Sequence, residues 1–205
     1  MTVERQPIVD AKDHAFAQTK GGMIAHCARR LFHMLIIPIA FFYYYFLVFH
    51  LPQKILSLSV LAMIFFVFLF EKLRIRAKLV LFGQRLYEAA RISAFAWTML
   101  SLGIILLVLP VQFAIPIVSV CGLVDPLLGE MRLHHINKKM VFAVGCGAAW
   151  LIWFLAAHLY HFSVWYGVIL APITVIVELP SLKWIDDNAL MMLVPLIGIQ
   201  ILERL

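Results

Sequence analysis

Seven apolar blocks, separated by short polar stretches, constrain this 205-residue chain more than any other feature. The blocks cover residues 34–51, 55–70, 92–109, 111–124, 140–160, 164–179 and 189–202. Hydrophobic residues make up 64% of the chain and charged residues 14%, whereas soluble globular domains contain about 45–50% and about 25%. Apolar runs of this length are typical of membrane-spanning helices. The pattern predicts an all-α integral membrane protein with about seven transmembrane helices.

The polar stretches divide the chain further. Residues 1–33 form a basic arm, which we expect in the cytoplasm, and residues 34–205 form a single polytopic membrane domain. Between the second and third blocks, apolar residues within 71–91 recur at helical spacing, which predicts that part of this stretch lies as an amphipathic helix at the membrane interface. The alternation in LRIRAKL also fits a short strand, and both interpretations stay open.

Proline interrupts the middle of the chain. Pro110 separates the third block from the fourth, and we expect Pro116 to break the fourth block again. Several blocks have only 14–18 residues, against about 20 for a full crossing, so a re-entrant path for some of them stays open.

Basic residues indicate the orientation. With seven crossings and a cytoplasmic N-terminus, 15 of the 17 Lys and Arg residues lie on the cytoplasmic side, in residues 1–33, 71–91, 125–139 and 181–188. This bias predicts an N-in, C-out topology. We expect the membrane to be a bacterial inner membrane, with the active face of the protein toward the cytoplasm. The basic residues lie between apolar blocks rather than on one soluble surface. We therefore interpret them as topology signals and headgroup contacts, and expect no nucleic-acid partner.

The same topology gathers acidic residues at one level. Seven carboxylates lie at cytoplasmic ends of blocks: Glu71, Glu88, Asp125, Glu130, Glu178, Asp186 and Asp187. Carboxylates at a membrane face are costly and usually line a polar cavity. Hard oxygen ligands suit Mg²⁺, and we predict that Asp125 and Asp187 hold it. Asp186 equally fits a helix N-cap.

A polar island, residues 124–139 (VDPLLGEMRLHHINKK), carries the charges that would face a phosphate. Arg132, Lys138 and Lys139 are predicted to contact phosphate oxygens, and Glu130 is a further candidate in the same stretch. Glu178 lies inside the apolar run VIVELP, where a carboxylate needs a functional partner. Glu178 or Glu88 is the expected acceptor of a hydroxyl proton.

Four stretches, in order along nearly the whole chain, carry a resemblance to one family. ARRLFHMLIIP, RLYEAARISAFAW, VDPLLGEMR with the following KK, and VELPSLKWIDDN resemble motifs of the dolichol kinase, phytol kinase and polyprenol kinase family. The resemblance implies a membrane kinase that phosphorylates a lipid alcohol from CTP with a divalent cation. It adds five nucleotide- or cation-binding candidates to those above, namely Arg30, His33, Arg85, Arg91 and Asn188.

A second hypothesis comes from a different class of protein. The residues after Lys139 read MVFAVG, where the family has an acid, a glycine and a hydroxyl. The alternative is therefore a non-catalytic lipid-binding or scaffold protein with the same fold. The sequence predicts a membrane lipid and a nucleotide as partners, and it specifies no oligomeric state.

The orientation is testable by cysteine accessibility. In a cysteine-free background, a cysteine at Lys183 should react with a membrane-impermeant reagent from the cytoplasmic side, and one at Lys54 from the opposite side. Labelling of both positions from one side would contradict the seven-crossing topology.

Overall fold

A computed structural model describes residues 20–178 and 185–204, and every regular element within these residues is a helix. The predicted all-α class is therefore confirmed. Four helices are long and apolar enough to span a membrane: Gly22–His50, Gln53–Arg76, Val111–Leu133 and Lys138–Tyr160. Shorter apolar helices account for the other three predicted blocks. Most of the predicted basic arm and the segment 179–184 lie outside the described residues.

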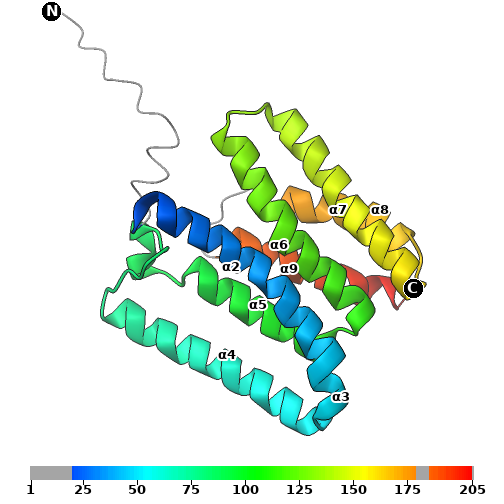
Figure 1. Cartoon of the computed structure of the whole chain (residues 1–205), viewed down its shortest axis with the longest axis horizontal. Helices are drawn as coiled ribbons and strands as arrows, with labels where there is room; N and C mark the ends of the chain where they lie inside the picture. The colour runs from blue at the N-terminus through cyan, green and yellow to red at the C-terminus, as the bar shows by residue number, and fades with distance from the viewer. Residues whose placement is uncertain (1–19, 179–184, 205) are drawn as a thin grey trace, which may run out of the picture.

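The N-terminal part of the chain forms two long helical segments that run in opposite directions. Helix α2 (Gly22–Phe42) continues through a π-helical turn, η1 (Tyr43–Leu47), into the short α3 (Val48–His50). Helix α4 (Gln53–Arg76) then runs back toward the start of α2 (Figure 1). Pro52 is the N-cap of α4, at the point where the chain reverses. Proline has no backbone N–H, and this costs nothing here because an N–H at the start of a helix has no acceptor within the helix.

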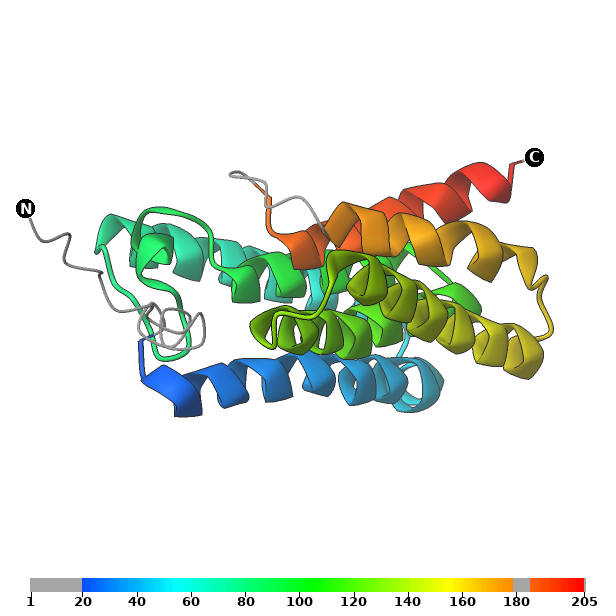
Figure 2. The same cartoon turned by 90° about the horizontal axis from the view of Figure 1, so that it is seen from above.

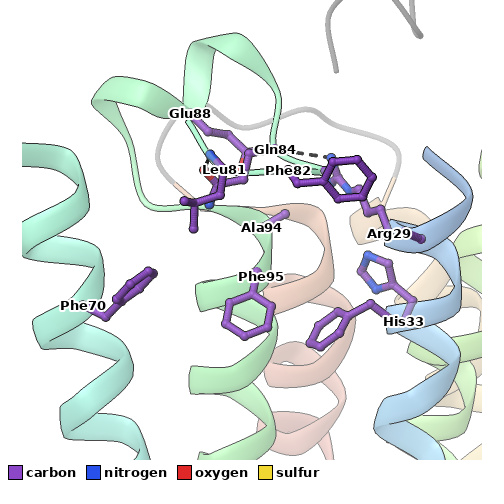
Figure 3. Close-up of a pocket in the computed structure, with 12 residues that line it drawn as sticks. Arg29, His33, Phe70, Leu81, Phe82, Gln84, Glu88, Ala94 and Phe95 are labelled. Atoms are coloured by element: carbon purple, nitrogen blue, oxygen red, sulfur yellow. Dashed lines mark hydrogen bonds and ion pairs between the residues drawn. The ribbon is translucent and has the colours of Figure 1, made fainter. Parts of the chain in front are cut away.

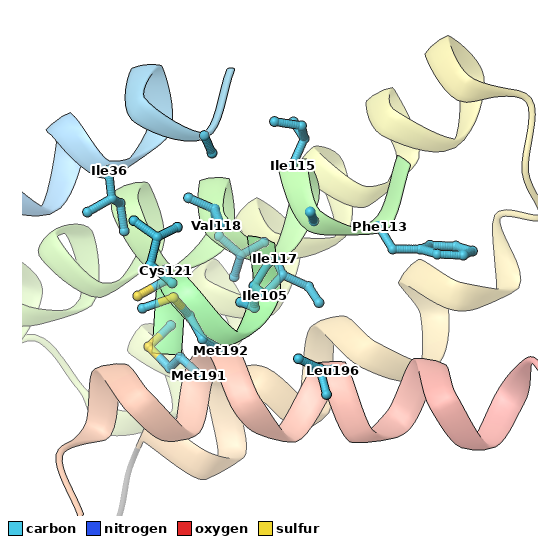
Figure 4. Close-up of a cluster of buried hydrophobic side chains, with 14 of the residues drawn as sticks. Ile36, Ile105, Phe113, Ile115, Ile117, Val118, Cys121, Met191, Met192 and Leu196 are labelled. Carbon is cyan, nitrogen blue, oxygen red and sulfur yellow. The ribbon is translucent and has the colours of Figure 1, made fainter. Parts of the chain in front are cut away.

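Helix α6 (Val111–Leu133) forms the centre of the bundle and packs against α2 and two C-terminal helices. Those helices are α7 (Lys138–Tyr160) and α9 (Asp187–Leu202), while α5 (Ala94–Val108) and α8 (Trp165–Glu178) pack on α9 from outside. Figure 1 shows α6 crossing between α2 and α9. The core around it is aliphatic and sulfur-rich (Figure 4), with Ile36, Ile117, Cys121, Met191 and Met192 fully buried.

The predicted break at Pro116 is wrong, because α6 runs without interruption through both Pro116 and Pro126. The helix also extends through the first half of the polar island, down to Leu133. Proline is tolerated inside a membrane helix when neighbouring helices hold the chain on both sides. The packing of α2 and α9 on α6 supplies that support.

The amphipathic helix predicted within residues 71–91 does not form as a separate element, and the alternative strand in LRIRAKL is wrong. Residues 71–76 complete α4, residues 77–85 are irregular, and a 3₁₀ turn, η2 (Leu86–Ala90), precedes α5. The cause is a buried ion pair, since the Arg74 Nη2–Glu71 Oε2 distance is 2.8 Å. In Figure 2 this loop lies beside the start of α2 (blue), at the same end of the bundle.

Arg74 and Glu71 fold the loop back onto α4. The Arg74 guanidinium donates to the backbone carbonyls of Leu79 at 2.8 Å, Glu88 at 2.9 Å and Arg91 at 2.6 Å. Glu71 in turn accepts from the backbone N–H and the hydroxyl of Ser93. These bonds satisfy loop carbonyls that a helix would have paired internally, so the apolar spacing does not become a helix.

Close approach of α2 and α6 depends on Gly122. A Cβ added there would lie 2.9 Å from the backbone oxygen of His33 and 2.9 Å from Ile37. Small residues at such crossings let membrane helices pack backbone to backbone. This contact holds α2 against α6.

Gly122→Ala should therefore destabilise the protein by about 1–3 kcal/mol, because the backbone oxygen of His33 cannot move aside. Gly147→Ala on α7 is the matched control, since nothing lies within 4 Å of its added Cβ. The control should be neutral or more stable, by up to about 1 kcal/mol. Unfolding in detergent micelles measures both, and equal responses would contradict the packing.

Candidate functional site

Three carboxylates meet at one end of the bundle. Asp125 lies on α6, Glu178 ends α8 and Asp187 begins α9. One oxygen from each lies within 4.8 Å of the others. The fold thus brings together the two predicted metal ligands, Asp125 and Asp187, and a predicted proton acceptor, Glu178. Asp125 and Asp187 are 62 positions apart in the sequence. We name these three residues the acidic cluster.

Two buried oxygen atoms in this region lack hydrogen-bond partners within the described residues. They are Glu178 Oε2 and Asn188 Oδ1, on side chains that are only 2% and 1% exposed. A buried polar atom without a partner costs about 1–3 kcal/mol, so such atoms usually mark a ligand or an ion. A set of carboxylate and amide oxygens fits a hard divalent cation such as Mg²⁺ or Mn²⁺.

One arginine pairs directly with the acidic cluster in the part of the chain that the structure describes. Arg132 Nη2 donates to Glu178 Oε1, from the last turn of α6. The Arg132 side chain is 40% exposed, so its guanidinium can also reach a ligand outside the bundle. Three carboxylates against one paired guanidinium leave an excess of negative charge, which favours binding of a cation.

Asp186 acts as the N-cap of α9. Its Oδ1 accepts from the backbone N–H of Asn188 at 3.2 Å and from Asn188 Nδ2 at 2.5 Å. Burial and, next to it, the negative charge of Asp187 together raise the pKa of Asp186 to about 7, against the opposing effect of Arg29. The cap interpretation of Asp186 is therefore confirmed, and the same bond fixes the amide of Asn188.

Glu130 and Arg30, both predicted nucleotide contacts, pair with each other. Arg30 Nε lies 2.8 Å from Glu130 Oε1, and Arg30 Nη1 donates to the carbonyl of Pro126. His26 joins the group, 3.5 Å from Glu130. Gly129 leaves room for the guanidinium, because an added Cβ would meet Arg30 Nη2 at 3.0 Å. This group joins α2 to α6, and Asp125 of the acidic cluster acts electrostatically on Arg30.

A third polar group lies where α2 faces the loop before α5. His33 is 4% exposed and its Nδ1 has no hydrogen-bond partner among the described residues. Glu88 is buried, accepts from the backbone N–H of Arg85 at 3.3 Å, and lies 3.7 Å from Arg29 Nη1. Sequence reasoning missed Arg29, because the spacing to His33 favoured Arg30. The two adjacent arginines in ARRLFH were the feature of the sequence that could have indicated Arg29 as well.

The remaining predicted contacts are exposed basic side chains. Arg85 Nη1 donates to the hydroxyl of Tyr87 at 2.7 Å, and the charges of Asp186 and Asp187 act on it. The other three, Arg91, Lys138 and Lys139, form no ion pair within the described residues. Both lysines open α7, where the side chain of Asn137 caps the helix by accepting from the N–H of Lys139.

Comparison with known proteins gives no match: no protein-family model fits the chain, and no curated protein and no solved structure is similar to it.

The pairing of Arg132 with Glu178 predicts an asymmetric response to mutation. Arg132→Gln leaves a buried carboxylate without its partner and should destabilise the protein by about 1–3 kcal/mol. Glu178→Gln leaves an arginine that water can reach, and should cost less than about 1 kcal/mol. Unfolding in micelles free of divalent cations measures both.

Adding Mn²⁺ should then restore more stability to Arg132→Gln than to Glu178→Gln, because only the former keeps all three carboxylates. Equal destabilisation, or no effect of Mn²⁺ on either variant, would contradict a cation site here.

Proposed function

We propose that this protein is a membrane phosphotransferase that phosphorylates the hydroxyl of a long-chain lipid alcohol from a nucleoside triphosphate, with CTP as the expected donor. One observation carries the proposal. Carboxylates from three helices converge in an apolar bundle, and two buried oxygens there have no partner within the described residues. Such a set of oxygens fits a divalent cation, and a metal-bound phosphate is the substrate most often handled this way.

In phosphoryl transfer the protein contributes mainly by positioning the reactants and neutralising the phosphate charge, and little by covalent chemistry. Asp125, Glu178 and Asp187 would hold a Mg²⁺ ion, which supplies a positive charge to the phosphate oxygens. The guanidinium of Arg132 would hold phosphate oxygens, two at once where its fork geometry allows. Lys138 and Lys139 stand at the positive end of α7, where an anion is stabilised.

Two carboxylates stay candidates for accepting the proton of the lipid hydroxyl. Glu178 pairs with Arg132 and belongs to the acidic cluster. Glu88 is buried near Arg29 and lies outside that cluster. A group that accepts a proton must come within hydrogen-bond reach of the hydroxyl, so the position of the lipid decides between them.

The site fits the seven-crossing proposal. The C-terminal end of α6, the start of α7, the end of α8 and the start of α9 lie at one level if these helices form successive hairpins. With the N-terminus inside, that level is the cytoplasmic face of a multi-pass protein of a bacterial inner membrane. Nucleotides are available on that face.

One observation favours the alternative, a non-catalytic lipid-binding or scaffold protein. Residues 140–145 continue α7 as a regular helix, and they offer no acid or hydroxyl beside the lysine pair. A nucleotide would have to bind through Arg132 and the acidic cluster instead.

The deciding experiment uses the purified full chain in lipid nanodiscs. CTP or ATP labelled at the γ-phosphate is supplied with Mg²⁺ against a panel of prenols, long-chain alkanols and diacylglycerol. The proposal requires label on a lipid. No transfer with any pair, together with no change in melting temperature at millimolar nucleotide and Mg²⁺, would establish the alternative. A nucleotide at a hundred times its Kd should add about 2.7 kcal/mol of stability.

Two neighbouring aspartates provide a matched pair of variants. Asp187→Asn removes a proposed cation ligand and should lower phosphoryl transfer at least ~100-fold, as should Asp125→Asn. Asp186→Asn keeps the N-cap, since asparagine caps as well as aspartate, and should change the rate less than ~10-fold. An equal loss in Asp186→Asn and Asp187→Asn, with unchanged folding, would contradict the assigned roles.

A further inference from the structure

A pocket of about 400 Å³ lies between α2, the end of α4 and the start of α5, below the loop that precedes α5 (Figure 3). Its apolar wall includes Ala28, Phe32, Phe70, Leu81, Phe82 and Phe95. Helix α2 and the α4–α5 pair border it from opposite sides, and both carry exposed apolar side chains such as Leu31, Phe66 and Leu69. In a bilayer, these faces contact lipid tails, so a chain can enter from the side.

The loop that covers the pocket is held in place by hydrogen bonds. Gly83 N–H donates to the Lys20 carbonyl and Lys20 N–H to the Gln84 carbonyl, each at 3.0 Å. The side chain of Gln84 accepts from the N–H of Leu81 at 2.9 Å. Gly83 has a φ of +84°, a conformation that other residues rarely adopt. The loop over the pocket is thus fixed to the start of α2.

One end of the pocket is polar. Arg29, His33 and Glu88 line it, and Figure 3 shows Arg29 and His33 on one side with Glu88 across from them. His33 Nδ1 is buried and has no hydrogen-bond partner within the described residues, which indicates a missing ligand atom. The Arg29–Glu88 distance of 3.7 Å is longer than a hydrogen bond, so both groups can accept a further partner.

This polar end borders the acidic cluster. The backbone oxygen of His33 contacts α6 at Gly122, one helical turn before Asp125. Arg29 acts electrostatically on Asp186, and Asp187 acts on His33. A hydroxyl held at His33 therefore lies on the side of α2 that faces the proposed cation site.

We propose that this pocket binds a single-chain lipid alcohol, with the hydroxyl among Arg29, His33 and Glu88 and the chain along the phenylalanine wall. The assignment rests on the proposed function for the identity of the ligand. Pockets of 300–1,000 Å³ enclose small molecules, so about 400 Å³ takes only the part of the chain next to the hydroxyl. The rest of the chain lies in the bilayer between α2 and α4. With the hydroxyl in this position, Glu88 rather than Glu178 accepts the proton of the lipid hydroxyl.

The test is photo-crosslinking of the full chain in nanodiscs with a long-chain alkanol that carries a diazirine near the hydroxyl. Mapping of the labelled peptides should place the label on residues of the pocket wall, Phe32 and Phe95 among them. The parent alcohol should compete at least ~10-fold better than the matching alkane, because the alkane cannot bond at the polar end.

Ala28→Trp fills the pocket from an exposed position on α2 and should reduce labelling at least ~10-fold. Leu31→Trp is the matched control: Leu31 is exposed on the same helix, does not line the pocket, and the variant should label normally. Label spread over the outer faces of α2 and α4, or equal competition by alkane and alcohol, would overturn the proposal.

The readout also separates this proposal from the proposed function. Labelling in the pocket that Ala28→Trp abolishes, in a protein that transfers no phosphate, would support the lipid site and reject the kinase. Phosphoryl transfer that Ala28→Trp leaves unchanged would support the kinase and reject this pocket.

Discussion

Carboxylates inside an apolar helical bundle are the constraint on which the rest of the structure depends. Each charged group removed from water costs several kcal/mol unless a partner compensates it. Two of the buried glutamates, Glu71 and Glu178, are compensated by an arginine from a neighbouring turn or helix. These pairs fix how chain segments meet. The Glu71–Arg74 pair folds the loop before α5, and Arg132 joins α6 to the end of α8.

The acidic cluster departs from this rule, and the departure is what suggests function. Glu71 has its full set of partners, from Arg74 and Ser93. Glu178 uses one oxygen and leaves the other buried without a partner among the described residues, next to Asp125 and Asp187. A structural role would predict satisfied oxygens, as at Glu71. An excess of oxygen ligands contributed by three helices is the arrangement expected of a cation site.

Local patterns in the sequence predicted the helices well, because apolar runs in a membrane protein leave few alternatives. The errors arose where distant residues decide local structure. Arg74 donates hydrogen bonds to loop carbonyls as far along the chain as Arg91, and the spacing of apolar residues does not reveal these bonds. Helix α6 continues through Pro116 because neighbouring helices support it. The predicted topology placed seven carboxylates at one membrane face, and these included the three residues of the acidic cluster, Asp125, Glu178 and Asp187. The pocket could not be predicted, since four separate segments line it, and Arg29 was passed over for Arg30.

The most direct test of the cation site is a Mn²⁺ titration of the purified protein, followed by electron paramagnetic resonance, without nucleotide or lipid alcohol. Free aqueous Mn²⁺ gives a sharp signal that broadens when the ion is held by protein oxygens. We predict about one Mn²⁺ site per chain at the acidic cluster, displaced by Mg²⁺ and absent when Asp125 and Asp187 are both changed to asparagine. No bound Mn²⁺, or binding that survives the double substitution, would contradict it.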